Sequence, residues 1–141
     1  MNLTLISNTM TDMLTKIIIQ EHNADKAGLH WDLRFEHNGV LKSWAIPKAR
    51  LPEGKEQLLA MQVSDHPLSW GDFDGVIKEG YGKGSVKLLA NELVEAKLDL
   101  DADKLRKISF EYGGKAYKLF HAPYLKGKGT YLIRELIKKQ S

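Results

Sequence analysis

The sequence predicts a mainly β protein, a small closed or partly open antiparallel β-barrel with one or two short helices. Two observations carry this prediction. Short apolar or alternating runs follow one another along the chain with turn residues between them, and apolar residues almost nowhere recur with a helical period. Many short strands at close spacing with little helix are typical of an all-β barrel or sandwich.

Turn signals bound the predicted strands in order. Residues 14–20 form the first strand, and residues 29–36 alternate strictly between apolar and polar side chains. Asn38-Gly39, the strongest short hairpin signal, joins this second strand to residues 40–46. Gly113-Gly114 is the turn of another predicted hairpin. The remaining strands are predicted at residues 57–63, 75–77, 85–89, 108–112, 116–120 and 130–137.

One stretch, residues 91–107, has no clear assignment. Its leucines do not keep a helical spacing, although residues 101–107 could form one short helix capped by Asp101. The sequence has no internal repeat, low-complexity tract or interior linker. We therefore expect a flexible N-terminus at residues 1–13 and a single domain at residues 14–141.

The composition limits the chemistry that this protein can perform. The chain has 141 residues, 43% of them hydrophobic, which suffices for one domain with its own core. It has no cysteine, which excludes disulfides, Fe–S clusters, thiolate zinc sites and a cysteine nucleophile. Histidine, aspartate and glutamate remain as the strong metal ligands. The net charge of +3 is compatible with an anionic partner.

The sequence has no convincing signal peptide or membrane-spanning segment. The apolar run at residues 17–19 is far shorter than the about 20 apolar residues that a span needs. We expect a cytoplasmic, soluble monomer that does not contact membranes.

The most informative segment for chemistry is the predicted strand at residues 29–36. Because side chains alternate along a strand, His30, Asp32 and Arg34 share one face. An imidazole and a carboxylate about 7 Å apart along a strand can converge on one cation, and the guanidinium can hold a phosphate beside it. The alternative is that these residues have no chemical function and form the solvated face of an antiparallel strand. The other face would enter the core with Trp31, Leu33 and Phe35.

Further histidines and loops offer weaker signals. His22 precedes a loop that could return it as a third ligand, and His66 lies at a predicted strand end. The glycine-rich residues 80–84 lack the helix that a phosphate-binding loop opens into, so a tight hairpin is the better interpretation. Basic and aromatic residues alternate in the C-terminal half, a pattern that suits a nucleic-acid groove but also arises from strand alternation alone.

Several of these segments together resemble a known family. In order along the chain, they resemble the metal-site signature and neighbouring motifs of the 3′-phosphoesterase domain of bacterial DNA ligase D. The resemblance is close over residues 16–89 and loose elsewhere, and the chain looks like a stand-alone member. The matching motifs are residues 20–22, 29–36, 39–48, 62–68, 72–77 and 79–86.

The resemblance implies a small β-barrel with a divalent metal, most plausibly Mn²⁺, on its concave face. It implies a metal-dependent phosphoesterase that trims DNA or RNA 3′ ends in repair, removing a terminal ribonucleoside and then the 3′-phosphate. The expected partners are nucleic-acid 3′ ends, with a DNA ligase or polymerase acting in the same pathway. By position, the metal ligands would be His22, His30 and Asp32, the catalytic residues Arg34 and His66, and the substrate-binding residues these two with Trp70 and Lys48.

Three departures from the family pattern affect these expectations. The stretch between His22 and His30 is two residues longer, so His22 would reach the metal only if that loop bulges. Trp70 stands where a tyrosine is expected, and Leu58 where an arginine is expected. We therefore expect a retained metal site with weaker or narrower activity. The alternative function is a catalytically weak barrel that binds nucleic-acid ends as a repair accessory.

Overall fold

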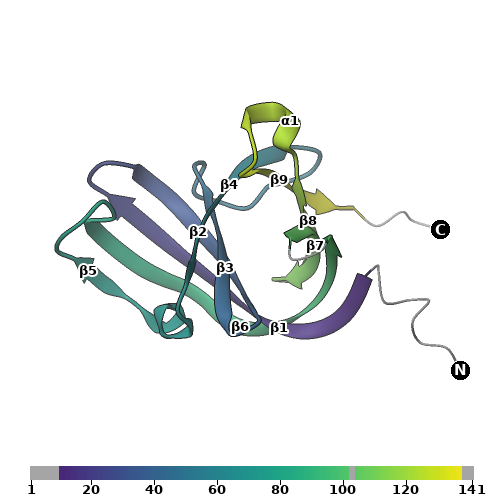
Figure 1. The fold of residues 1–141 in the computed structure, drawn as a ribbon, viewed down its shortest axis with the longest axis horizontal. Helices are drawn as coiled ribbons and strands as arrows, with labels where there is room; N and C mark the ends of the chain where they lie inside the picture. Colours follow the sequence, from purple (N-terminus) through teal and green to yellow (C-terminus); the bar gives the residue numbers. More distant parts are fainter. Residues whose placement is uncertain (1–9, 102–103, 138–141) are drawn as a thin grey trace, which may run out of the picture.

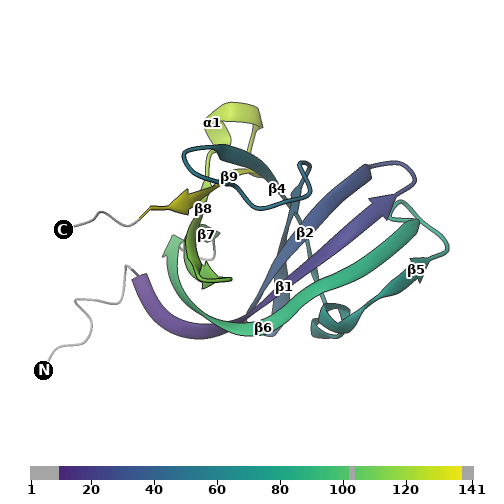
Figure 2. The same ribbon diagram turned by 180° about the vertical axis from the view of Figure 1, so that it is seen from behind.

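The structure, a computed structural model, describes residues 10–101 and 104–137. Neighbouring strands are hydrogen-bonded in the order β1-β2-β3-β4-β9-β8-β7-β6, and β6 pairs with β1 to close an eight-stranded antiparallel barrel. Figures 1 and 2 show β1 and β6 as two long curved strands lying side by side. The ninth strand, β5, extends the sheet beyond β6. The barrel predicted from the sequence is confirmed.

The elements have the following bounds. The strands are β1 (Met10–Ala24), β2 (Gly28–His37), β3 (Val40–Ile46), β4 (Gln57–His66), β5 (Gly75–Ile77), β6 (Gly84–Asp101), β7 (Lys104–Tyr112), β8 (Lys115–His121) and β9 (Thr130–Leu136). A 3₁₀ helix, η2, spans Leu68–Asp72, and a short helix, α1, spans Pro123–Lys126. Among the residues that the structure describes, no helix is long and apolar enough to cross a membrane.

Both predicted hairpins are present. Asn38 and Gly39 have φ angles of 51° and 80°, and they connect β2 to β3. Gly113 and Gly114, with φ angles of 59° and 80°, connect β7 to β8. Two successive residues with positive φ give a turn whose twist matches that of the flanking strands.

The predicted helix at residues 101–107 is wrong. β6 runs without a break through residues 91–101, and Asp101 is its last residue. Residues 102–103 lie outside the described part of the chain, and β7 begins at Lys104. Cross-strand pairing decides this segment, because Leu98 faces Ile108 and Ala96 faces Phe110 in the barrel core. Tertiary burial of this kind outweighs a local capping preference.

The core fills the inside of the barrel. Its largest fully buried side chains are Trp44, Phe35 and Phe110. The Phe35 ring meets Trp44 and Phe110 edge to face, with ring centroids 6.2 Å and 5.0 Å away. Such edge-to-face contacts are favourable beyond the apolar area that they bury. The odd-numbered side chains of β2 therefore face inward, as predicted, which leaves its even-numbered side chains on the outer face.

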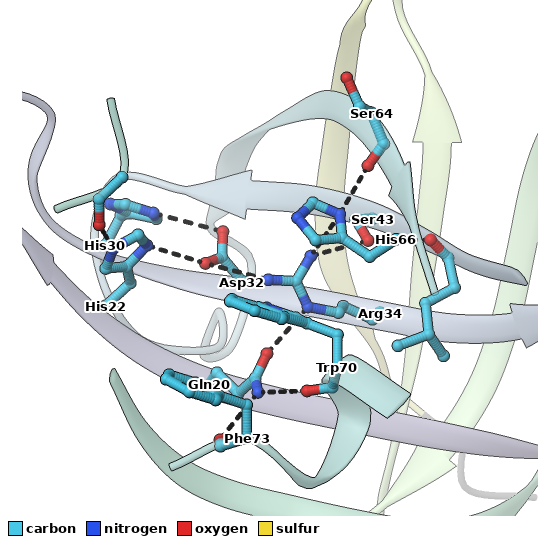
Figure 3. Close-up of polar contacts among 12 residues, drawn as sticks. Gln20, His22, His30, Asp32, Arg34, Ser43, Ser64, His66, Trp70 and Phe73 are labelled. Carbon is cyan, nitrogen blue, oxygen red and sulfur yellow. Dashed lines mark hydrogen bonds and ion pairs between the residues drawn. The ribbon is translucent and has the colours of Figure 1, made fainter. Parts of the chain in front are cut away.

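Part of that outer face is covered by residues 68–73, which we call the covering segment. Gly71 lies so close to Ile18 of β1 that an added Cβ would be 3.2 Å from the Ile18 side chain. Asn91 of β6 donates hydrogen bonds to the Gly71 carbonyl (2.8 Å) and to Asp72 (3.0 Å). The segment is thereby fixed over β1 and β6, and the polar residues of β2 lie beneath and beside it (Figure 3).

Candidate metal centre and its guanidinium neighbour

Strand register brings the two histidines together. His22 of β1 lies directly opposite His30 of β2, and Gln20 lies opposite Asp32, in an unbroken antiparallel ladder. Paired residues of such a ladder point to the same face. The residues between His22 and His30 continue the two strands and form the turn at residues 25–27. No bulge in the β1–β2 ladder is needed to deliver His22, contrary to the condition set from the sequence.

The three side chains converge at hydrogen-bonding distances (Figure 3). His22 Nδ1 lies 3.4 Å from one oxygen of Asp32, and His30 Nε2 lies 3.3 Å from the other. The two imidazole centroids are 4.8 Å apart. These residues form a group whose potential ligand atoms all lie within 4.8 Å of one another. The cluster could hold a metal ion.

The remaining ring nitrogens show which atoms carry the protons. His22 Nε2 lies 2.7 Å from the Gly82 carbonyl, and His30 Nδ1 lies 3.1 Å from the Gly28 carbonyl. Because a carbonyl only accepts, each of these nitrogens donates its N–H. In a neutral ring, the other nitrogen then presents a lone pair to the Asp32 carboxylate. The two ring nitrogens and the carboxylate are then three hydrogen-bond acceptors that face one another with no donor among them. A proton or a cation must lie between them.

This arrangement fits a metal centre. Histidine ligands of protein metal sites usually donate their second N–H to a carbonyl or carboxylate, which fixes the tautomer and the ring orientation. Two imidazole nitrogens and one carboxylate suit Mn²⁺, Fe²⁺ or Zn²⁺ better than Mg²⁺ or Ca²⁺, which prefer oxygen ligands.

The contacts within the cluster shift the pKa values of two of its members. The hydrogen bond to Asp32 raises the pKa of His30 above its ordinary value, against the opposing effect of burial. For Asp32, burial raises the pKa, but the hydrogen bond from His30 and the charge of Arg34 outweigh it and lower the pKa overall. Asp32 and His30 therefore favour each other's charged forms.

Arg34 adjoins the cluster and is almost fully buried, with 3% of its surface exposed. Its Nε donates to Gln20 Oε1 (2.8 Å), and its Nη1 donates to Ser43 Oγ (2.8 Å). Its Nη2 lies 3.5 Å from Asp32. Burial lowers the pKa of Arg34, and the negative charge of Asp32 offsets part of that shift. The guanidinium is thus fixed on three sides.

Gln20 connects Arg34 to the covering segment. It is fully buried, and its Nε2 donates to the carbonyls of Trp70 (2.9 Å) and Phe73 (3.1 Å). The sequence predicted no role for Gln20 or Ser43. Both could have been found from the sequence. Gln20 shares a strand face with His22, and pairing residues outward on both sides of the Asn38-Gly39 turn places Ser43 opposite Arg34.

His66 lies at the end of β4, beside Arg34. Its Nδ1 is 2.8 Å from the Ser64 carbonyl and 3.3 Å from Arg34 Nη1. One nitrogen cannot donate to the first and accept from the second at once, and the shorter contact favours donation to Ser64. Burial and the charge of Arg34 lower the pKa of His66. A neutral His66 therefore keeps a lone pair on Nε2.

Trp70 lies next to His66, with ring centroids 5.7 Å apart. Its indole is stacked on the Phe73 ring at 4.6 Å and an interplanar angle of 7°. Figure 3 shows the indole lying over the Phe73 ring. One face of the indole is therefore occupied by Phe73.

The structure differs from two sequence-based expectations about this strand face, its exposure to solvent and its side of the barrel. The face is not simply solvated, since Asp32 is 5% exposed and Arg34 is 3% exposed. Nor does the cluster lie on the concave side of the barrel: it lies on the outer face, opposite Leu33 and Phe35 of the core. The covering segment is bonded to this part of the sheet through Gln20, and a strand pattern cannot reveal a cover that comes from elsewhere in the chain.

Two expected substrate-site positions are not brought to the cluster. Lys48 is exposed in the turn after β3, where its charge acts on Glu56, and within the described residues it has no hydrogen bond or ion pair to the cluster. Leu58 is buried in the barrel core opposite Ile133. Its role there is packing.

Comparison with known proteins identifies the family. The model of the DNA ligase D 3′-phosphoesterase domain matches residues 20–119, which include every residue of the cluster and the covering segment. The chain belongs to the DNA ligase D 3′-phosphoesterase domain family. The resemblance stated from the sequence is confirmed.

Curated relatives carry this domain within much longer proteins. The multifunctional non-homologous end joining protein LigD of Pseudomonas aeruginosa is 46% identical over 74 residues, which are 52% of this chain and 9% of that protein. Its namesake in Mycolicibacterium smegmatis is 48% identical over 73 residues, or 50% of this chain and 9% of that protein. The chain therefore matches less than a tenth of the length of these relatives.

Proposed function

We propose that this chain is a metal-dependent phosphoesterase that processes DNA or RNA 3′ ends, removing a terminal ribonucleoside, a 3′-phosphate or both. The observation that carries the proposal is the His22, His30 and Asp32 cluster, in which both histidines donate outward and turn their lone pairs inward. Membership of a 3′-phosphoesterase family supports it.

A divalent ion, for which we propose Mn²⁺, would be held by His22, His30 and Asp32. Bound there, it would polarise a phosphoryl oxygen and lower the pKa of a water molecule. Mixed nitrogen and oxygen ligands are compatible with this ion, and the resemblance to the family is what favours it over Fe²⁺ or Zn²⁺.

The neighbouring residues would bind and orient the scissile phosphate. After its bonds to Gln20, Ser43 and Asp32, Arg34 retains one N–H on each terminal nitrogen, which allows a phosphate to be held by two donors. These donors would stabilise the charge that develops on the phosphoryl oxygens. When protonated, His66 would bind the phosphate through its Nε2–H or give that proton to the leaving oxygen.

The function extends to a pathway by analogy with the relatives. Their names describe multifunctional end-joining proteins. We propose that this chain acts in end-joining DNA repair, on ends that a DNA ligase or polymerase also handles. A 3′-hydroxyl is the product that such partners would use.

The test is an end-processing assay. A primer–template carrying one 3′ ribonucleotide, and a matched strand ending in a 3′-phosphate, would each be incubated with the protein and Mn²⁺ or with EDTA. We expect shortening or dephosphorylation with Mn²⁺ only, and its loss in His30→Ala and Asp32→Ala. The control is His121→Ala, because His121 is bonded to the Lys128 carbonyl outside the cluster. Binding without any product after hours would favour the accessory function instead.

The tryptophan at position 70 predicts a preference between the two substrates. An indole has one N–H donor and no acidic hydroxyl, whereas its face can stack on a base for about 1–3 kcal/mol. Since Phe73 covers one face of Trp70, a terminal nucleoside would use the other. We expect ribonucleoside removal to be better preserved than 3′-phosphate hydrolysis, and Trp70→Tyr to shift the ratio of the two rates toward the phosphate. A ratio that the substitution leaves unchanged would make Trp70 a packing residue.

A further inference from the structure

The barrel wall opposite the metal cluster carries a group of cations on its outer face. β8 is four strands from β2 in either direction around the closed barrel, so the two strands lie on opposite walls. On this far wall, Arg134 of β9 is paired with Lys118 of β8, and Lys107 of β7 is paired with Phe120 of β8. The core residues Ile133 and Leu119 alternate with them and point inward.

These cations are close together and poorly compensated. Within the described residues, neither Arg134 nor Lys118 has a carboxylate within ion-pair distance, and Lys107 is 3.9 Å from Asp99. Arg134 Nε is buried and lacks a hydrogen-bond partner. Burial, followed by the charges of Lys107 and Arg134, lowers the pKa of Lys118. An uncompensated guanidinium and an ammonium held side by side favour the binding of an anion.

The chemistry of the surroundings narrows the kind of anion. Lys118 Nζ lies 5.3 Å from the centroid of the partly exposed Phe120 ring, so a cation and an aromatic face are adjacent. Beyond Arg134 the surface is hollowed into a pocket of about 430 Å³, which Lys55 and Glu135 also line, and Glu135 is paired with Lys115. Cations in a row beside an aromatic ring are the combination with which proteins bind single-stranded nucleic acid.

We propose that the outer face of β8 and β9, centred on Arg134, Lys118 and Phe120, binds the phosphate backbone of single-stranded nucleic acid. This is a second contact surface, separate from the metal cluster. The choice of nucleic acid over another polyanion rests on the proposed function, because a protein that processes ends benefits from holding the strand elsewhere.

The test measures DNA binding without turnover. A fluorescein-labelled single-stranded DNA would be titrated with the protein in EDTA, and fluorescence anisotropy would give the Kd over a range of salt concentrations. Each phosphate contact on single-stranded DNA contributes about 0.7 to the slope of log K against log salt, or about fivefold in affinity at 0.1 M salt. The double variant Lys118→Gln with Arg134→Gln should therefore bind about 25-fold more weakly at that salt, with a slope smaller by about 1.4.

Two further variants separate this surface from a general effect of charge. Lys115→Gln removes one charge from the same strand, as Lys118→Gln alone would, but its side chain pairs with Glu135 and alternation turns it from the Lys118 face. It should change the Kd by less than about twofold, because no phosphate contact is lost. Gln57→Lys adds a cation at the exposed position that faces Arg134 on β4, and it should tighten binding about fivefold.

Three results would overturn the proposal: a double variant that binds like the parent, a Lys115→Gln variant that is equally weakened, or a Gln57→Lys variant with no gain. Displacement of the DNA by oligoglutamate at the same concentration of charge would also overturn it and indicate an acidic protein partner. Because the assay contains no metal, a failure of the proposed phosphoesterase chemistry would leave these outcomes unaffected.

Discussion

Gln20 is the residue whose replacement should most clearly show how the candidate site is held together. We predict that Gln20→Met destabilises the protein by about 3.5–5 kcal/mol. The Arg34 donor loses its acceptor, and hydrogen bonds to charged groups contribute about 1.5–3 kcal/mol. The Trp70 and Phe73 carbonyls each lose a donor, at about 1 kcal/mol apiece. Methionine fills similar space, so little of the effect comes from packing.

Urea denaturation measures this loss. With a slope of about 2 kcal/mol per molar urea, the midpoint should fall by about 1.8–2.5 M. The control is Gln62→Met, which removes an exposed glutamine from β4 and should shift the free energy of unfolding by less than about 0.5 kcal/mol.

Gln20→Glu separates the contact of Gln20 with Arg34 from its contacts with the covering segment. A carboxylate can still accept from Arg34, but it cannot donate to the two carbonyls of the covering segment. We expect it to rescue little of the stability. Equal midpoints for Gln20→Met and Gln62→Met would refute the reasoning, and full rescue by glutamate would show that only the contact with Arg34 matters.

Three further outcomes are expected. Gly84→Ala should lower the free energy of unfolding in urea by at least about 3 kcal/mol, because its Cβ would lie 2.1 Å from the Asn23 carbonyl oxygen. Gly80→Ala has open space around its Cβ and should lower it by about 1 kcal/mol. Equal losses in the two variants would contradict this reasoning. Arg34→Lys should lower the rate of 3′-end processing at least about 100-fold while Mn²⁺ affinity stays within a few fold, since an ammonium cannot replace two parallel donors; parent-like turnover would exclude two-donor binding. Mn²⁺ at about 100 times its Kd should stabilise the parent by about 2.7 kcal/mol, seen as a higher Tm, and should stabilise Asp32→Asn far less; the same rise in both would place the ion elsewhere.

The sequence predicted those parts of the fold that local patterns determine. Strict alternation at residues 29–36 and the Asn38-Gly39 turn together fixed the register of β2 against β3. The same alternation correctly separated His30, Asp32 and Arg34 from the core face. Residues 91–107 had no clear assignment because residues 91–99 pair with residues 10–18 of β1, which are distant in sequence, and no local period marks that pairing.

Burial of the candidate site could not be predicted from the same patterns. Alternation assigns a side chain to a face but does not say what covers that face. The hydrogen bonds of Gln20 to Trp70 and Phe73 span at least 50 positions of sequence. Similarly, the placement of Leu58 in the core depends on β4 pairing with β9, a contact between distant parts of the chain. Roles that rest on the family alone, such as that of Lys48, remain predictions.

The hydrogen bonds around Arg34 have a consequence for ligand binding. A freely rotating long side chain gives up about 1.5–2 kcal/mol of conformational entropy when it becomes ordered. In this protein Gln20, Ser43 and Asp32 already hold the guanidinium in one orientation, so that loss belongs to folding. An anion that reaches Arg34 meets a donor pair that no longer has to be immobilised, and more of the interaction energy is available as affinity. The same rigidity selects among anions by shape, because the donors cannot turn to follow a ligand whose oxygens are spaced differently.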